Sequence, residues 1–359
     1  MTLGAVAALA AACDSDPAEP GMNEVEDPME LPVDPPELPE PCDAAGVAGD
    51  PYVGGVNCRT VEVDGYPRQY LVYVPPGHTF TAASPAPVVL MFHGGSQTGE
   101  RFYRLSRWKE KADEVGLIAV FPTALRHYLI EDDRWATQWH DYYVAPEIDP
   151  TRRPAGYPED APWPADDVAF ARAILDDLES TAYADPERMY ATGFSNGASM
   201  TARLAIEATD RIAAFAYVAG RFCDPVDADW TAAPPRPAIL VLGTIDGKIL
   251  GHIVDGDTTA FEPLPLDADS LLDHDALVGC LESAVAGFDL AWEPYDVLEL
   301  NGQTNIEWST PLGQPWGNSF RLIVLGGLGH RYPNGENNPL EWDAADRFWE
   351  FFRDLRLTP

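Results

Sequence analysis

The stretch ATGFSNGASM, residues 191–200, contains a serine whose surroundings favour chemistry. Ser195 lies between Gly193 and Gly197, after an apolar run and before helix-forming residues. A serine hydroxyl is a poor nucleophile until a base accepts its proton and an acid orients that base. Glycines at these two positions leave room for the sharp strand-to-helix turn that presents such a serine above a sheet. We therefore predict that Ser195 is a nucleophile, provided that the chain supplies a base and an acid.

The base must be a histidine, and the chain has 7 of them. Where a serine stands on a strand-to-helix turn, the acid and then the histidine follow it along the chain. This order leaves His252, His274 and His330. His330 comes in the glycine-rich segment GGLGHRYP directly after the last apolar run, whereas the other two lie in a polar insertion. His330 is therefore the predicted base.

His330 follows the apolar run at 320–327. The acid should follow the apolar run before that one, at 237–244. The segment ILVLGTIDG places Asp246 there, where its carboxylate would accept the imidazole N–H and fix the tautomer. Asp255 and Asp257 follow closely and remain alternatives.

Negative charge that develops on a carbonyl oxygen needs preorganised hydrogen-bond donors. One predicted donor is the backbone N–H of Asn196, directly after the nucleophile and at the start of a helix. The other should come from the HGG sequence after the apolar run PVVLMF, where Gly95 fits best. We expect His93 to organise that loop rather than to act as a second base.

The elements that must position these residues alternate between strands and helices. Residues 59–76 alternate apolar and polar side chains around an Asp-Gly turn and predict an antiparallel hairpin. Short apolar runs predict buried strands at 87–93, 117–122, 188–194, 212–220, 237–244 and 320–327. Helical spacing marks residues 100–115, 167–182 and 341–355. The predicted fold class is α/β, with a mostly parallel sheet and helices on both faces.

Two stretches interrupt the alternation. Residues 125–164 are rich in aromatic residues, prolines and acids, and residues 247–290 form a long interruption after a strand. Such insertions at the carboxyl edge of a sheet shape substrate clefts, so Trp135 and Trp139 are candidates for substrate contact. The alternative is that these aromatic residues only pack the insertion onto the body.

Composition and the amino terminus bear on location. The chain of 359 residues has a formal net charge of −35, which disfavours nucleic acid and anionic membrane surfaces as partners. Residues 1–13 form a short apolar run that ends in small residues at Cys13 and resembles a bacterial lipoprotein signal. Residues 14–41 are dense in proline and acid and predict a disordered tether before a folded domain at 42–359. We expect a secreted or cell-surface protein, lipid-anchored through Cys13, with no transmembrane segment.

Export allows disulfides among the remaining four of the 5 cysteines. We predict the pairs Cys42–Cys58 and Cys223–Cys280, although sequence alone does not fix the connectivity.

Five segments together resemble the poly(3-hydroxybutyrate) depolymerase and feruloyl esterase group of the α/β-hydrolase superfamily. They are MFHGGSQTG (91–99), DDVAFARAILDDL (166–178), DPERMYATGFSNGASMTARLA (185–205), GTID (243–246) and GGLGHRYP (326–333). The resemblance implies an α/β-hydrolase fold and secreted hydrolysis of an ester bond. It also implies a catalytic Ser195, Asp246 and His330, an oxyanion hole at Gly95 and Asn196, and a structural Asp167.

The resulting prediction is an exported serine esterase that works through an acyl-enzyme and needs no metal or organic cofactor. Its expected partner is an ester substrate, such as a polyester, an esterified plant polysaccharide or a small ester. The alternatives are a serine peptidase on the same fold and a surface-tethered binding protein without activity.

Overall fold

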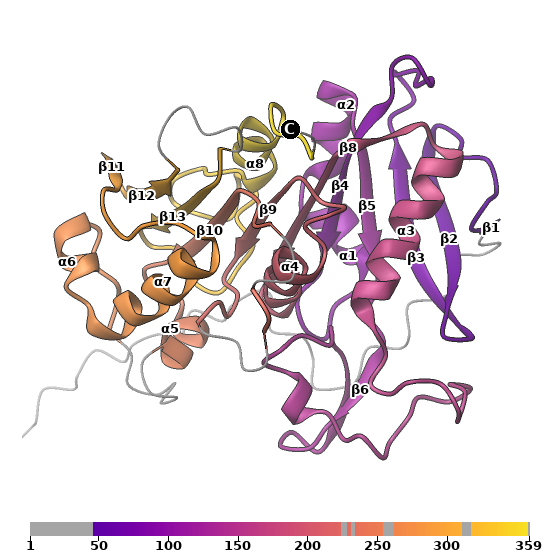
Figure 1. The fold of residues 1–359 in the computed structure, drawn as a ribbon, viewed down its shortest axis with the longest axis horizontal. Coiled ribbons are helices and arrows are strands. Elements are labelled where there is room, and N and C mark those ends of the chain that lie inside the picture. Colours follow the sequence, from indigo (N-terminus) through magenta and orange to yellow (C-terminus); the bar gives the residue numbers. More distant parts are fainter. Residues whose placement is uncertain (1–45, 224–227, 231–233, 254–261, 311–316, 358–359) are drawn as a thin grey trace, which may run out of the picture. The chain divides into compact units, whose positions relative to one another are not determined.

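The computed structural model describes residues 46–223, 228–230, 234–253, 262–310 and 317–357 (Figure 1). All of them lie within one unit, Pro32–Pro359. The other unit, Met1–Leu31, lies outside the described residues, and so do the predicted signal at 1–13, the tether at 14–41, Cys13 and Cys42. The predicted boundaries of these segments therefore remain predictions.

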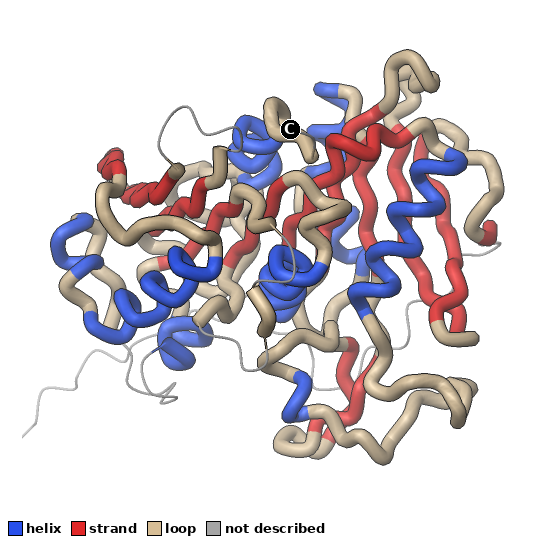
Figure 2. Tube along the Cα trace, viewed as in Figure 1, coloured by secondary structure: helices blue, strands red, loops and turns tan. Residues whose placement is uncertain are grey.

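One sheet of eleven strands runs through the described part of the chain, in the order β1-β2-β3-β5-β4-β8-β9-β10-β13-β12-β11 (Figure 2). The strands are β1 Gly46–Val47, β2 Gly55–Val63, β3 Tyr66–Val74, β4 Ala86–Phe92, β5 Ile118–Pro122, β8 Ala184–Phe194, β9 Ala214–Val218, β10 Ala238–Gly243, β11 Asp296–Leu300, β12 Gln303–Ser309 and β13 Ser319–Leu325. From β5 to β13 all neighbours are parallel, and the short β1 pairs parallel with β2. The pairs β2–β3, β3–β5, β11–β12 and β12–β13 are antiparallel.

Helices cover both faces of this sheet, as the pattern of the sequence predicts. They are α1 Gly99–Leu105, α2 Trp108–Val115, α3 Asp167–Thr181, α4 Asn196–Glu207, α5 Gly247–Ile253, α6 Ala268–Leu272, α7 Asp275–Gly287 and α8 Ala344–Phe352. In Figure 1, α3 crosses in front of the strands and α1 lies behind them. Every residue of β4, β5, β9 and β10 is buried, which explains why their sequences are continuously apolar. The predicted fold class is confirmed.

The parallel strands matter for function because their carboxyl ends share one edge of the sheet. Strands β4, β8, β9, β10 and β13 end immediately before the segments that hold His93, Ser195, Arg221, Asp246 and His330. Ser195, Asp246 and His330, which the sequence predicts as catalytic residues, therefore leave the sheet on the same side, and so does Arg221, which it did not predict.

The predicted hairpin at 59–76 is confirmed. Strands β2 and β3 pair in register around Asp64 and Gly65, which have φ values of 53° and 73°. Two successive residues in the left-handed region are typical of the turn that matches the twist of an antiparallel hairpin.

The two irregular stretches contain structure that the sequence pattern did not predict. Within residues 125–164, β6 Arg126–Leu129 pairs with β7 Arg134–Thr137, and a short 3₁₀ helix, η1, spans Ala145–Glu147. Within 247–290 lie α5, α6 and α7. After this stretch, β11 and β12 form a second hairpin at the edge of the sheet.

A disulfide joins Cys223 to Cys280 on α7, which confirms one of the two predicted pairs. The other pair, Cys42–Cys58, remains a prediction because Cys42 lies outside the described residues. Among the residues that the structure describes, no helix has the length and apolar character that a membrane span requires.

Candidate active site

Ser195 lies on a strained turn between β8 and α4. Its backbone has φ 54° and ψ −122°, a conformation that residues other than glycine rarely adopt. The turn is held by its N–H, which donates to Val218 O at 3.0 Å, and by its carbonyl, which accepts from Ser199 N at 3.0 Å. A serine held in this way projects from the carboxyl edge of the sheet instead of packing into it.

The two glycines around Ser195 are required by close backbone contacts. A Cβ on Gly193 would lie 2.1 Å from Gly197 O, and a Cβ on Gly197 would lie 2.3 Å from both Phe92 O and His93 O. Both distances are far below a normal van der Waals contact. The prediction that these glycines make room for the turn is confirmed.

Three side chains from separate loops form a chain of hydrogen bonds. Ser195 Oγ lies 2.9 Å from His330 Nε2, and His330 Nδ1 lies 3.0 Å from each carboxylate oxygen of Asp246. The Asp246 side chain is buried, whereas His330 and Ser195 remain partly exposed. In this arrangement the carboxylate accepts from Nδ1–H, so Nε2 is the acceptor that faces the serine hydroxyl. The His330 ring also packs on Phe194, with ring centroids 5.0 Å apart.

Backbone contacts hold the loops of the acid and the base together. Ile245 N donates to Leu328 O at 3.2 Å, and Gly327 N donates to Thr244 Oγ1 at 2.9 Å. A Cβ on Gly243 would lie 2.0 Å from Leu328 O, so the loops approach as closely as a glycine allows. This pairing fixes the position of Asp246 relative to His330.

The loop after β4 contains Gly95. His93, expected to organise this loop, is buried and bonds through both ring nitrogens: Nδ1 lies 2.7 Å from Gly94 O, and Nε2 accepts from Ala124 N at 3.0 Å. Burial lowers the pKa of His93 to about 4, so it is neutral at pH 7. A Cβ on Gly95 would lie 2.5 Å from Gln138 Oε1, which shows that the insertion reaches this loop.

The side chain of Asn196 has a structural role that its position in the motif did not reveal. Its Oδ1 accepts from Trp139 N at 2.8 Å, and its Nδ2 donates to Trp139 O at 3.1 Å and to Asp141 Oδ2 at 2.7 Å. The residue after the nucleophile thereby ties the 125–164 insertion to the turn. As the first residue of α4, Asn196 also has a backbone N–H without an intrahelical acceptor, as all helices do at this position.

Trp139 and Trp135, the predicted substrate contacts, lie in different surroundings. Trp139 is fully buried, packs edge-on against Phe92, and donates from Nε1 to His93 O at 2.8 Å. Trp135 is partly exposed on β7 and packs edge-on against Tyr128. Of the two, only Trp135 presents surface to solvent.

The structure also accounts for the other candidates. His274 caps the start of α7 and His252 lies on α5, so neither contacts Ser195 in the described hydrogen bonds. Asp255 and Asp257 lie outside the described residues.

Asp167 is buried, pairs with Arg68 and accepts from His140 N, as a structural residue would. No group of three or more His, Cys, Asp or Glu side chains in the described ranges is arranged to hold a metal ion.

Asp141 is buried and carries an unusual pKa. Desolvation raises the pKa of its carboxyl from 3.8 to about 6, against the lowering effect of N–H groups of Val144 and Tyr143 and of the Asn196 amide. Because burial raises the pKa of Asp141 in the folded state, its charged carboxylate lowers the free energy of unfolding. This loss of stability is absent below pH 4 and fully present above pH 6.

We therefore expect replacement of Asp141 by Asn to change the pH dependence of stability. The free energy of unfolding of Asp141→Asn, minus that of the wild type, should rise by on the order of 3 kcal/mol between pH 4 and pH 7. Urea unfolding at several pH values measures this difference. The exposed Asp269→Asn on α6 serves as the matched control for removal of a carboxylate. A flat difference for Asp141→Asn would contradict the raised pKa.

Comparisons with known proteins bear on the family of this chain. Residues 68–229 match the family described as Esterase PHB depolymerase. The chain is 30% identical over 226 residues to the protein named "Putative esterase NocK" from Nocardia uniformis subsp. tsuyamanensis, which covers 60% of this chain and 58% of that protein. It is 33% identical over 111 residues to feruloyl esterase B from Piromyces equi. That alignment covers 27% of this chain and 19% of the feruloyl esterase. The chain thus spans less than two thirds of the length of each of these relatives. The resemblance predicted from the five segments is confirmed.

Solved structures show the same fold at low identity. An acetyl xylan esterase from Aspergillus awamori matches with a TM-score of 0.50 at 15% identity, covering 84% of this chain and 99% of that one. An S-formylglutathione hydrolase from Agrobacterium tumefaciens matches with a TM-score of 0.50 at 16% identity, covering 84% and 95%. At this identity the likeness shows the α/β-hydrolase fold alone.

Proposed function

We propose that this chain, which belongs with the poly(3-hydroxybutyrate) depolymerase and feruloyl esterase group of α/β-hydrolases, is a serine carboxylic ester hydrolase. The observation that carries the proposal is the hydrogen-bonded chain from Ser195 through His330 to Asp246, at 2.9 Å and 3.0 Å. Ser195 is the nucleophile, His330 the general base and acid, and Asp246 the residue that orients the imidazole.

The reaction runs in two halves. Ser195 Oγ attacks the ester carbonyl while His330 Nε2 takes the hydroxyl proton, and the tetrahedral intermediate collapses as His330 gives that proton to the departing alkoxide. Water then attacks the acyl-enzyme with the same proton transfers and releases the carboxylic acid. The Asp246 carboxylate stabilises the imidazolium in both halves and remains ionised.

Gly95 and Asn196 are the proposed oxyanion donors. Asn196 offers a backbone N–H at the first turn of α4, where the helix dipole also favours negative charge. Gly95 offers its N–H from the loop that neutral His93 holds in place.

Trp139 and Asn196 are also proposed as positioning residues. The indole N–H of Trp139 bonds to His93 O at the start of the Gly95 loop, and its backbone bonds to the Asn196 side chain. One buried residue thus connects both proposed oxyanion donors. Trp135, with its partly exposed ring, stays a candidate for substrate contact.

A serine peptidase on the same fold and an inactive binding protein are the alternatives. A panel of purified-protein assays separates the three: neutral 4-nitrophenyl esters of short acids, a feruloyl ester, an acetylated xylan, a polyhydroxybutyrate suspension and unmodified peptides. We expect hydrolysis of the small neutral esters. Cleavage of peptides without ester hydrolysis would favour the peptidase, and no turnover of any substrate would favour the binding protein.

Export and lipid anchoring belong to the proposal as well. The apolar run that ends at Cys13 and the acidic, proline-rich segment 14–41 support a tethered enzyme at the cell surface. Expressed with its own amino terminus in a bacterium that lipidates exported proteins, the full chain should partition into the detergent phase of a Triton X-114 extract. The Cys13→Ser variant should partition into the aqueous phase. Equal partitioning of the two proteins would exclude the anchor.

A further inference from the structure

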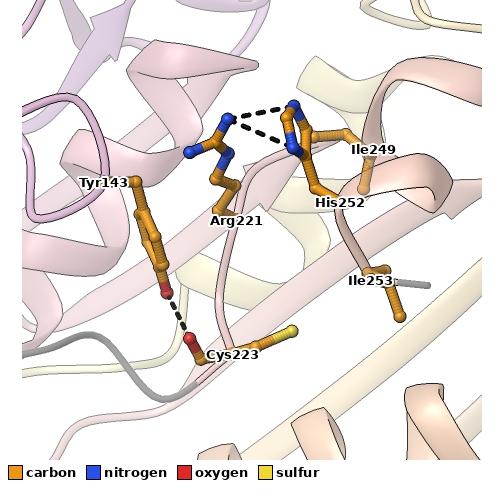
Figure 3. A pocket seen from close by; sticks show the side chains of 6 residues that line it. All are labelled: Tyr143, Arg221, Cys223, Ile249, His252 and Ile253. Carbon is orange, nitrogen blue, oxygen red and sulfur yellow. Dashed lines mark hydrogen bonds between the residues drawn. The ribbon is translucent and has the colours of Figure 1, made fainter. Parts of the chain in front are cut away.

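A pocket of about 170 Å³ is lined by residues that follow strands β9 and β10 and by Tyr143 of the 125–164 insertion. Its described lining consists of Tyr143, Arg221, Cys223, Ile249, His252 and Ile253 (Figure 3). For comparison, a cavity of about 150 Å³ in another protein holds a molecule the size of benzene. The pocket therefore has room for a short arm of a substrate.

The walls of this pocket belong to the same segments that hold the reactive residues. Arg221 follows β9, and its N–H donates to Ser199 Oγ at 3.0 Å on the first turns of α4, which begins after Ser195. Ile249 and His252 lie on α5, which begins directly after Asp246. Burial and Arg221 lower the pKa of His252, and the nearby carboxylate of Asp246 acts in the opposite direction. A group bound in the pocket would thus lie near the ester carbonyl at Ser195.

Arg221 is the one charged side chain among the described residues that line the pocket. Figure 3 shows its guanidinium directed at the His252 ring, with Nη2 at 3.0 Å and 3.2 Å from the two ring nitrogens. Burial and the charge of Arg221 lower the pKa of His252, so the ring is neutral and accepts from Arg221. On the other side, Glu147 lies 3.6 Å from Arg221 Nη1 and does not line the pocket.

These contacts leave part of the guanidinium available, and its charge also acts on the carboxyls of Glu147 and of buried Asp141. A guanidinium has five N–H donors in a planar fork, and a neutral imidazole uses one donor without cancelling any charge. The distance to Glu147 is longer than a hydrogen bond, and both side chains are about one third exposed, at 28% and 34%, so this pair is weak. In a chain with a net charge of −35, an arginine placed in this way provides a local site for a single negative charge.

We propose that this pocket binds a carboxylate carried by the ester substrate, with Arg221 as its counter-ion and Ile249 and Ile253 against a short aliphatic arm. The proposal rests on the proposed function and narrows its substrate class to esters with a free carboxylate. A carboxylate fits better than a phosphate, because one planar anion matches the fork and the single charge of Arg221 while His252 stays neutral.

Paired esters test this inference. In the first pair, the carboxylate lies on the acid half of the ester: charged 4-nitrophenyl hydrogen glutarate is compared with neutral 4-nitrophenyl pentanoate. In the second pair, it lies on the alcohol half: charged 4-acetoxybenzoate is compared with neutral 4-acetoxybenzamide. For each pair, the measured quantity is the ratio of kcat/KM for the charged ester to that for the neutral ester. A charge-assisted hydrogen bond strengthens binding by about 10–100-fold. Arg221→Gln should therefore lower the ratio of kcat/KM values by about that factor in one of the two pairs. The affected pair tells which half of the ester enters the pocket.

Two further variants serve as controls. Arg221→Lys keeps the charge but loses the fork, so its ratio should fall between those of the wild type and Arg221→Gln. Arg347→Gln removes an exposed arginine from α8 and should leave both ratios unchanged. If Arg221→Gln keeps both ratios within about twofold of the wild type, against the expected factor, the carboxylate site is wrong.

A binding measurement separates failure of the site from failure of the proposed function. Calorimetry with monomethyl glutarate on Ser195→Ala should detect binding, and Ser195→Ala/Arg221→Gln should bind it about tenfold more weakly or worse. If the wild type hydrolyses no ester but this difference is found, the proposed function fails and the carboxylate site stands. If neutral esters are hydrolysed and the two variants bind monomethyl glutarate equally, the site fails and the proposed function stands. Thermal melting of each variant checks that it is folded.

Discussion

Replacement of Ser195 by alanine should lower the turnover of neutral esters by about 10⁶-fold, which is the loss measured when a serine hydrolase loses its nucleophile. The reason is that His330 has no hydroxyl to activate, so no acyl-enzyme can form. Binding should persist, because the proposed oxyanion donors are backbone groups that the substitution leaves in place. The rate of 4-nitrophenyl butyrate hydrolysis at saturating substrate measures the effect.

The stability of Ser195→Ala should match that of the wild type. The hydroxyl has a described hydrogen bond to His330, which is itself partly exposed, and alanine at φ 54° bears the same backbone strain as serine. Ser180→Ala on α3, which removes an exposed hydroxyl that bonds to Asp177 O, is the matched control and should retain full activity. Activity of Ser195→Ala above one hundredth of the wild-type rate would mean that another residue is the nucleophile.

Asp246→Asn should cause the second largest loss, about 10⁴-fold in kcat, as the equivalent change does in a serine protease. An amide in place of the carboxylate presents N–H to His330 Nδ1 and favours the tautomer whose proton lies on Nε2. That nitrogen can then no longer accept the proton of Ser195. In the wild type, Ile249 N donates to Asp246 Oδ1 at 3.2 Å. An asparagine oxygen can accept the same hydrogen bond, so the variant should fold. Steady-state kinetics with the same ester gives kcat.

Asp255→Asn is the matched control, since Asp255 and Asp257 were the alternatives that the sequence left open. It should retain most of the wild-type kcat. Near-normal activity in Asp246→Asn together with a collapse in Asp255→Asn would reverse the assignment of the acid.

Much of the fold could be predicted from the sequence because parallel strands buried on both faces leave a clear pattern. The apolar runs at 87–93 and 237–244 correspond to β4 and β10, whose residues are all buried. The hairpin at 59–76 carries its own turn signal in Asp64 and Gly65. In contrast, β11 is exposed at every residue and lies at the sheet edge, so its sequence lacks the alternation that marks a half-buried strand.

The candidate site could be predicted in part, for a related reason. Ser195, Asp246 and His330 each follow a strand, and chain order then limits the choice of partners. The contacts of Asn196 with Trp139 and Asp141 span 57 and 55 residues, and no local pattern announces an amide that bonds across such a distance. The same holds for Arg221, which meets His252 only because β9 and β10 are neighbours in the sheet.

Covalent labelling by a fluorophosphonate tests the central claim most directly, because the reagent needs an activated serine but no knowledge of the substrate. The folded protein should gain one adduct, peptide mass spectrometry should place it on Ser195, and labelling should be absent from Ser195→Ala and strongly slowed in Asp246→Asn. No adduct on the folded wild-type protein, or an adduct on a residue other than Ser195, would contradict the account.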